Sequence, residues 1–184
     1  MNNLWERIQN ALETRSARAV VNDLNPGANA TQVAELTRQF DEESIAELTA
    51  YLRIHDGQDG RYDLVFPWQL LCVQSINSEI ELMNETFPDG VEEDIDAIGP
   101  VKPVLWNRAW LPFASDGAGN LMCIDADPDD GGKKGQVIQW AADPPYVEVI
   151  ALSLQTWLEK FAVDLERDVY EWNGQNESWS RADR

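Results

Sequence analysis

The 184-residue sequence is poor in basic residues and has no long apolar run. It contains 14 Lys plus Arg against 33 Asp plus Glu, which gives a formal net charge of −19. Proteins that bind nucleic acid or anionic membranes need a surplus of Lys and Arg near the phosphates, so this composition excludes both kinds of partner. No stretch reaches the roughly 18 apolar residues that a transmembrane helix requires.

Cysteine and histidine are also scarce. The two cysteines, Cys72 and Cys123, lie in apolar runs, and so few cysteines in a chain of this length argue against a secreted disulfide scaffold. We therefore expect both thiols to be free and buried. Residues 1–18 lack the apolar stretch of about 7–15 residues found in secretory signal peptides, and together these absences predict a cytoplasmic protein.

The apolar residues that are present, 43% of the chain with eight Trp, are enough to form a core. Their spacing predicts helices first, then a cluster of strands, then a last helix, an order typical of α+β proteins. We expect one domain over residues 1–172, with a mixed or antiparallel sheet flanked by helices and a polar, frayed tail over 173–184. Helices are expected over about 4–12, 31–40, 41–57, 76–87 and 153–169, with Thr31, Asp41 and Ser153 as caps, and strands over 64–66, 104–106, 110–114, 121–126, 137–140 and 146–151.

The negative charge is unevenly distributed. Residues 62–132 carry 14 acids and only two bases, which is a net −12, while the segments before and after carry −4 and −3. No base occurs between Arg61 and Lys102, and residues 88–103 have the composition of an acidic loop inserted in the domain. Two interpretations are open: a solvated surface that keeps the protein soluble, or a patch that attracts a basic partner.

Motifs that would indicate catalysis or cofactor binding do not fit. The single histidine, His55, is expected at a helix C-terminus, where an imidazolium would interact favourably with the helix dipole. The stretch from Asp125 to Gly131 resembles a calcium loop, but Asp130 replaces the required Gly and Gln136 the required Glu, so a turn between strands is favoured. The Gly/Lys cluster 131–135 lacks the pattern of a phosphate-binding loop. We predict no metal, no cofactor and no enzyme activity.

Several segments, taken together, resemble the SUKH superfamily, in the branch of the fungal cell-wall assembly regulator (Smi/Knr type). The main one is residues 110–125, WLPFASDGAGNLMCID, and the resemblance extends over about residues 4–162. Four shorter segments agree in order: Asn25-Pro26-Gly27-Ala28, His55-Asp56-Gly57-Gln58, Gly135-Gln136-Val137-Ile138, and Ser153-Leu154 through Trp157-Leu158. Within the main segment, residues 116–120 are expected to form a hairpin turn, with glycines at positive φ and the Asp and Asn side chains bonding the local backbone.

The resemblance implies a protein-binding α+β domain without catalysis. Bacterial members of the superfamily are typically immunity proteins that neutralise delivered toxins, often nucleases, and fungal members regulate cell-wall synthesis. Our first hypothesis is therefore an immunity protein whose acidic surface binds a basic toxin domain. The alternative is a regulatory scaffold with several partners, and a third class, a metal-dependent hydrolase using Asp116 or Asp125, has little support.

The candidate partner-binding residues combine the acidic cluster with two tryptophans. Trp is usually a core residue, but an exposed Trp beside acids would be a binding anchor, because binding hot spots are enriched in Trp. The proposed set, centred on the acidic loop, is Glu85, Asp89, Glu92, Glu93, Asp94, Asp96, Trp106 and Trp110.

Overall fold

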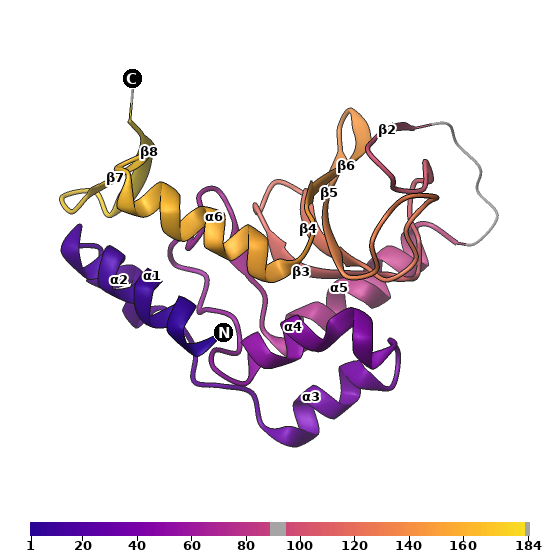
Figure 1. The fold of residues 1–184 in the computed structure, drawn as a ribbon, viewed down its shortest axis with the longest axis horizontal. Coiled ribbons are helices and arrows are strands. Elements are labelled where there is room, and N and C mark those ends of the chain that lie inside the picture. Colours follow the sequence, from indigo (N-terminus) through magenta and orange to yellow (C-terminus); the bar gives the residue numbers. More distant parts are fainter. Residues whose placement is uncertain (89–94, 183–184) are drawn as a thin grey trace.

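The computed structural model describes residues 1–88 and 95–182, and in these ranges it contains six helices and eight strands (Figure 1). The helices are α1 (Asn2–Thr14), α2 (Arg18–Asn22), α3 (Ala30–Thr37), α4 (Glu42–Leu52), α5 (Val73–Thr86) and α6 (Leu154–Glu166). The strands are β1 (Gln69–Leu70), β2 (Asp96–Ile98), β3 (Trp110–Ser115), β4 (Leu121–Asp125), β5 (Gln136–Ala142), β6 (Pro145–Ala151), β7 (Tyr170–Asn173) and β8 (Ser178–Arg181).

The main sheet has six strands in the order β1-β3-β4-β5-β6-β2. Strands β3 to β6 form an antiparallel meander, and β1 joins β3 antiparallel. At the other edge, β2 pairs with β6 in parallel, so the sheet is mixed. The predicted α+β class, with a single domain and a mixed sheet flanked by helices, is confirmed.

Helices α3, α4 and α6 begin where the side chain of the preceding residue bonds free N–H groups of the first turn. The carboxylate of Asp41 accepts the N–H of Glu43 at 3.2 Å, and the hydroxyl of Ser153 accepts that of Thr156 at 3.2 Å, as predicted for both caps. The cap of α3 is Asn29 rather than Thr31. Asn29 and Gln32 form a reciprocal capping box, which fixes the start of the helix two residues earlier.

Both faces of the sheet are buried. Side chains alternate along β3, so that Leu111 and Phe113 pack with the helices in the larger apolar cluster, while Trp110 lies in the second cluster on the opposite face. The second cluster is closed by the C-terminal half of α5 and by the segment 95–109, which contributes Ile95, Val101 and Leu105. Residues 95–103 therefore cover a core, which corrects the expectation that they belong to a plain loop.

Two expected strands are absent from the described residues. Residues 104–106 do not pair with any strand of the sheet. The side chain of Leu105 packs in the second cluster. Residues 64–66 form only an isolated bridge between Val65 and Trp68, and the strand begins later, at Gln69.

The expected frayed tail is a docked hairpin. Strands β7 and β8 pair antiparallel, and Trp172 lies opposite Trp179 with ring centroids 5.1 Å apart. Trp179 is only 8% exposed, and its indole N–H donates to the carbonyl of Asp63 at 2.9 Å. In Figure 1 this hairpin lies at the end of the molecule opposite β2, beyond α6. The buried ring of Trp179 and the partly buried ring of Trp172 hold a segment whose composition is otherwise polar.

Among the described residues, no helix is both long and apolar enough to cross a membrane.

Candidate functional site

Helix α5 is held at its N-terminus by the segment His55-Asp56-Gly57-Gln58. One carboxylate oxygen of Asp56 accepts the N–H of Val73, the first residue of α5, at 2.8 Å. The side-chain oxygen of Gln58 accepts the N–H of Leu70 at 2.9 Å, next to the helix. Gly57 has φ +64, and a Cβ there would lie 2.4 Å from the backbone N of Cys72. A side chain cannot fit there, so the segment can approach the start of α5 this closely only with glycine.

His55 does not cap a helix as a cation. Its Nδ1 lies 3.0 Å from the carbonyl oxygen of Asn25, its Nε2 lies 3.3 Å from the side-chain nitrogen of Gln9, and its ring packs edge-on against Trp5. Burial lowers the pKa of His55, against the opposing effect of the hydrogen bond with Asn25. The imidazole is therefore neutral at pH 7 and joins the 25–28 turn to α1, which corrects the expected capping role.

The turn between β3 and β4 is built by Asp116, as expected. Its carboxylate accepts the N–H groups of Ala118 at 2.9 Å and Asn120 at 3.0 Å, and the side-chain amide of Asn120 at 2.6 Å. Gly117 and Gly119 have φ +71 and +98. Burial acts to raise the pKa of Asp116, but these hydrogen bonds outweigh it and the pKa lies below its ordinary value. The turn therefore carries a fixed negative charge at neutral pH.

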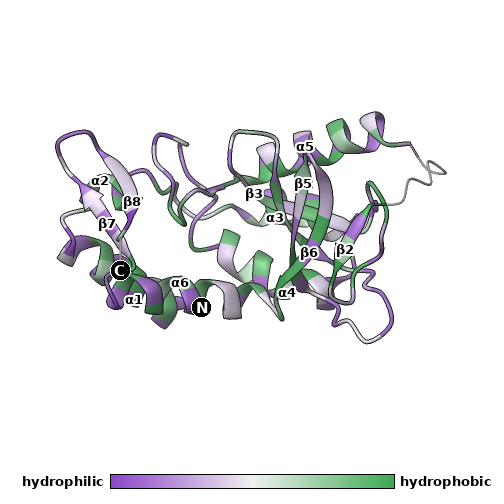
Figure 2. Ribbon diagram, turned by 90° about the horizontal axis from the view of Figure 1, so that it is seen from above, coloured by the Kyte–Doolittle hydropathy of each residue, from purple (hydrophilic) through white to green (hydrophobic). Residues whose placement is uncertain are grey.

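A groove of about 470 Å³ lies between α5 and this turn, and we call it the α5 groove. Met83, Leu121 and Trp140 are buried and form its apolar floor, and the ring of Phe87 packs edge-on against Trp140 at 5.8 Å. Leu82, on the α5 side, is 55% exposed. The colouring of α5 alternates between apolar and polar along the helix (Figure 2). The other lining residues are Glu79, Thr86, Ser115, Gly117 and Gly119.

Acidic side chains lie on two sides of the α5 groove. Glu79 lines it, Glu85 is exposed on the same helix, and Asp116 lies in the turn on the other side. Glu81 lines a separate groove together with Arg38 of the segment after α3. The negative field also acts on Asp63. Burial raises the pKa of Asp63, a hydrogen bond from Gln69 opposes this rise, and the negative charge of Asp116 adds to it. The groove therefore combines apolar surface with a negative field, which suits a ligand that is both apolar and positively charged.

The predicted acidic residues are divided between different places. Glu85 is exposed on α5 beside the α5 groove, and Asp96 is exposed on the edge strand β2. Asp89, Glu92, Glu93 and Asp94 lie outside the described residues.

The two predicted tryptophans belong to the second apolar cluster. Trp106 is half-buried, its indole N–H donates to the side chain of Asn84 at 3.0 Å, and its ring packs edge-on against Trp110 and Trp140. Trp110 is 0% exposed. It therefore has no surface to offer a partner, which corrects the expectation that it is an anchor: as the first residue of β3 it points into the face that segment 95–109 covers.

Leu82 and the α5 groove were not anticipated. A signal was present: Ile76, Ile80, Met83 and Phe87 define the buried stripe of the helix, and Leu82 falls outside it. A large apolar residue off the stripe of an amphipathic helix is expected to be exposed.

The residues considered for catalysis or metal binding have structural contacts. Asp125 is buried, and it accepts the side-chain amide of Gln136 at 2.9 Å and the N–H of Asp127 at 3.0 Å. Burial raises the pKa of Asp125, against the hydrogen bond from Gln136. Both thiols are free, with Cys123 buried and Cys72 only partly so. Within residues 1–88 and 95–182, no group of three or more His, Cys, Asp or Glu side chains is placed to hold a metal ion.

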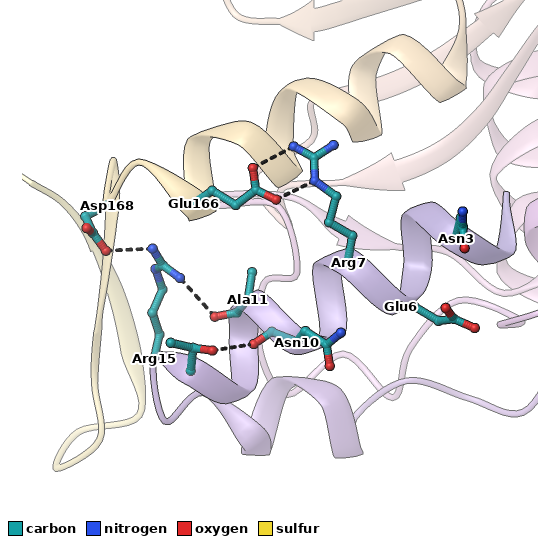
Figure 3. Close-up of a pocket in the computed structure, with 9 residues that line it drawn as sticks. Asn3, Glu6, Arg7, Asn10, Ala11, Arg15, Glu166 and Asp168 are labelled. Atoms are coloured by element: carbon teal, nitrogen blue, oxygen red, sulfur yellow. Dashed lines mark hydrogen bonds and ion pairs between the residues drawn. The ribbon is translucent and has the colours of Figure 1, made fainter.

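A larger and more open groove, of about 710 Å³, lies between α1 and the end of α6 (Figure 3). Arg7 of α1 forms a two-pronged ion pair with Glu166, and Arg15 pairs with Asp168 at 2.6 Å. Figure 3 shows these guanidinium groups directed at the carboxylates and not into open space. The ion pairs in this groove therefore join α1 to the end of α6, and they occupy both of the arginines that line it.

The fold and the α5 groove define an α+β domain with an acidic, partly apolar surface. Residues 27–160 match the SMI1 / KNR4 family (SUKH-1), and the chain belongs to this family. This confirms the resemblance seen in the sequence.

Named relatives are fungal proteins. The cell wall biosynthesis/cell cycle regulator smi1 of Schizosaccharomyces pombe is 29% identical over 157 residues, which are 76% of this chain and 31% of the relative. The cell wall assembly regulator SMI1 of Saccharomyces cerevisiae is 39% identical over 66 residues, 36% of this chain and 13% of the relative. A KNR4/SMI1 homolog of Yarrowia lipolytica is 34% identical over 87 residues, 47% of this chain and 12% of the relative. The chain spans about a third or less of the length of these relatives.

Proposed function

We propose that this chain is a non-catalytic protein-binding module that takes a basic protein partner at the acidic surface of α5. The observation that carries the proposal is the charge of this helix surface. Glu79 lines the α5 groove, Glu85 is exposed nearly two turns further along the helix, and no base occurs in the chain from residue 62 to residue 101. Glu81 adds charge on the neighbouring side of α5, where Arg38 also lies. Such a surface attracts basic proteins from a distance and repels nucleic acid and anionic lipid.

The relatives' names support a regulatory role for such a module. The proteins of Schizosaccharomyces pombe and Saccharomyces cerevisiae are named as regulators of cell wall biosynthesis or assembly. A regulator of this kind acts by contacting other proteins, and we expect several partners of moderate affinity. The cytoplasm, where such regulators would meet their partners, is the compartment we propose.

A second candidate is an immunity protein that neutralises a toxin domain, such as a nuclease. The net charge of −12 over residues 62–132 favours it, because a nuclease needs a basic cleft for its substrate phosphates and an acidic surface can occupy that cleft. This candidate predicts one partner, bound tightly, with an association rate that falls steeply with salt.

The test uses the whole chain, tagged and immobilised, to capture partners from the proteome of its source at low and at physiological salt. A variant with Glu79, Glu81 and Glu85 all changed to Gln removes the proposed charge. The matched control changes Glu6, Glu13 and Glu171, which are exposed away from α5, and so has the same net charge. We expect the α5 variant alone to lose basic partners. Equal capture by the two variants would refute the proposed surface. Several partners captured by the control variant would favour the regulator, and a single partner would favour the immunity protein.

A further inference from the structure

The α5 groove has a feature that charge alone does not require, which is exposed apolar surface on its α5 side. Leu82 is 55% exposed and lies beside a floor made of Met83, Leu121 and Trp140. Burying a large side chain on such a floor stabilises a complex, and binding hot spots typically consist of a central apolar contact within a polar rim. Extending the protein-binding function above, we propose that the α5 groove takes a basic segment of the partner through one large apolar side chain, which packs against Leu82 while flanking Lys or Arg residues pair with the acidic rim.

The rim is placed for such flanking charges. On the surface of α5, Glu79 lies three residues before Leu82 and Glu85 three residues after it, and residues at this spacing are neighbours on a helix. Across the groove, Asp116 keeps its negative charge at neutral pH because its hydrogen bonds lower its pKa. An apolar side chain seated on Leu82 therefore has carboxylates on both sides, which complement Lys or Arg three or four residues away in the bound segment.

The same charges exclude other occupants. A second copy of this chain would bring the same acidic surface, with a net charge of −19 on each copy, and would be repelled. An apolar segment without bases would gain nothing from the rim, and a basic segment without an apolar residue would leave the floor exposed to water. Charge complementarity thus selects a partner segment that carries both.

The wall opposite α5 leaves room for the backbone of this segment. Gly117 and Gly119 line the groove, and both are required at positive φ by the turn. Among the described residues, no atom lies within 4 Å of a Cβ built on Gly117, and the nearest to one on Gly119 is the Cβ of Ala142 at 4.0 Å. Because these two residues have no side chains, the turn leaves space for the backbone of a bound segment to lie close to the floor of the groove.

The probe is a synthetic 15-residue peptide with a central Leu, Arg three and four residues to either side, and Ala and Gln elsewhere. A second peptide replaces the Leu by Ser, and a third keeps the Leu but replaces every Arg by Glu. Binding to the whole chain is measured by amide chemical-shift changes in two-dimensional NMR, which also report where the peptide binds. We expect the largest shifts over residues 79–87 and 115–121, and an affinity for the Leu peptide about fivefold or more above that for the Ser peptide.

Protein variants test the anchor from the other side. Leu82→Ser removes the apolar contact from an exposed helix position, so folding is preserved, and it should weaken the Leu peptide about fivefold while leaving the Ser peptide unchanged. Leu152→Ser is the matched control, because Leu152 is 63% exposed on a loop that does not line the groove. It should leave both affinities unchanged.

The outcomes separate the anchor from the charge. If the Leu and Ser peptides bind equally, or if Leu82→Ser behaves like Leu152→Ser, the apolar anchor is refuted and the charge-based function stands. If the Glu peptide binds as well as the Arg peptides, complementarity to the acidic rim is refuted, and with it the proposed function. Shifts that map away from the α5 groove refute the site.

Discussion

Replacing Asp56 should loosen the helix that carries the proposed site. The first N–H groups of a helix have no partner within it, and Cys72, which precedes α5, supplies no side-chain hydrogen bond to them among the described residues. The cap comes instead from Asp56, seventeen positions before Val73, whose N–H it accepts at 2.8 Å. Its second carboxylate oxygen accepts the side-chain amide of Gln32 at 3.2 Å. One side chain therefore joins α3, the end of α4 and the start of α5.

The size of the effect follows from these contacts. Loss of an N-cap hydrogen bond costs about 0.5–2 kcal/mol, and loss of a negative charge at a helix N-terminus costs about 0.3–1 kcal/mol. The bond from Gln32 is 3.2 Å long and only part-buried, so it adds about 0.5 kcal/mol, the low end of the range for a hydrogen bond. We therefore expect Asp56→Ala to lower the free energy of unfolding by about 1–3 kcal/mol. Asp56→Asn keeps an oxygen acceptor and should cost less than about 1 kcal/mol.

Urea unfolding at pH 7, followed by far-ultraviolet circular dichroism, measures these differences. Asp59→Ala is the control, because Asp59 is exposed and close in sequence, and its removal should change stability by less than about 0.5 kcal/mol. Hydrogen exchange should show faster exchange in the first turn of α5 in Asp56→Ala. An Asp56→Ala variant as stable as Asp59→Ala would show that Asp56 does not hold the helix.

Two further predictions concern the docked hairpin and the buried histidine. Trp179→Ala should lower the free energy of unfolding by roughly 3 kcal/mol in urea unfolding, because a buried ring and its bond to Asp63 are lost, and a change below about 1 kcal/mol would mean that the hairpin contributes little. Because burial lowers the pKa of His55, the unfolded chain binds a proton more readily than the folded one, so stability is lost as pH falls below about 6.5. The His55→Gln variant should lose less stability than the natural chain between pH 7.5 and 5. Equal losses would show that protonation of His55 does not cause the loss of stability at low pH.

The helices and the meander could be predicted because their signals are local. The apolar stripes of α1, α4 and α6 and the caps Asp41 and Ser153 lie within the segments that they organise. The strands β3 to β6 follow one another through short turns rich in glycine, aspartate and proline, so each strand pairs with its neighbour in sequence.

Most of the errors involve partners that are distant in the sequence. The cap of α3 is a local exception, because Asn29 bonds to Gln32 within the same turn as the predicted Thr31. Strand β2 pairs with β6 some fifty residues later, and its residues Asp96 to Ile98 carry no clear strand pattern of their own. The apolar run 104–106 has the composition of a strand, yet it covers the second cluster. Its sequence does not show this, because a short apolar run does not reveal which surface it packs against. The α5 groove could not be predicted either. The helix and the β3–β4 turn that form its two sides were both expected, but they are brought together only by the packing of α5 on β3.

The proposed binding groove and the segments that flank the family match lie in different parts of this molecule. Helix α1 and the β7–β8 hairpin lie outside the residues that match the family, yet Trp5, Ile8 and Trp179 are buried in the larger apolar cluster. They pack at the α6 end, where Arg7 and Arg15 join the start of the chain to the end of α6 (Figure 3). The α5 groove is instead made entirely from residues within the family match and lies on the far side of the sheet from α6. Substitutions in the flanking segments should therefore change unfolding free energy with little effect on peptide affinity, whereas Leu82 and its acidic neighbours, being exposed, can change affinity with little effect on folding.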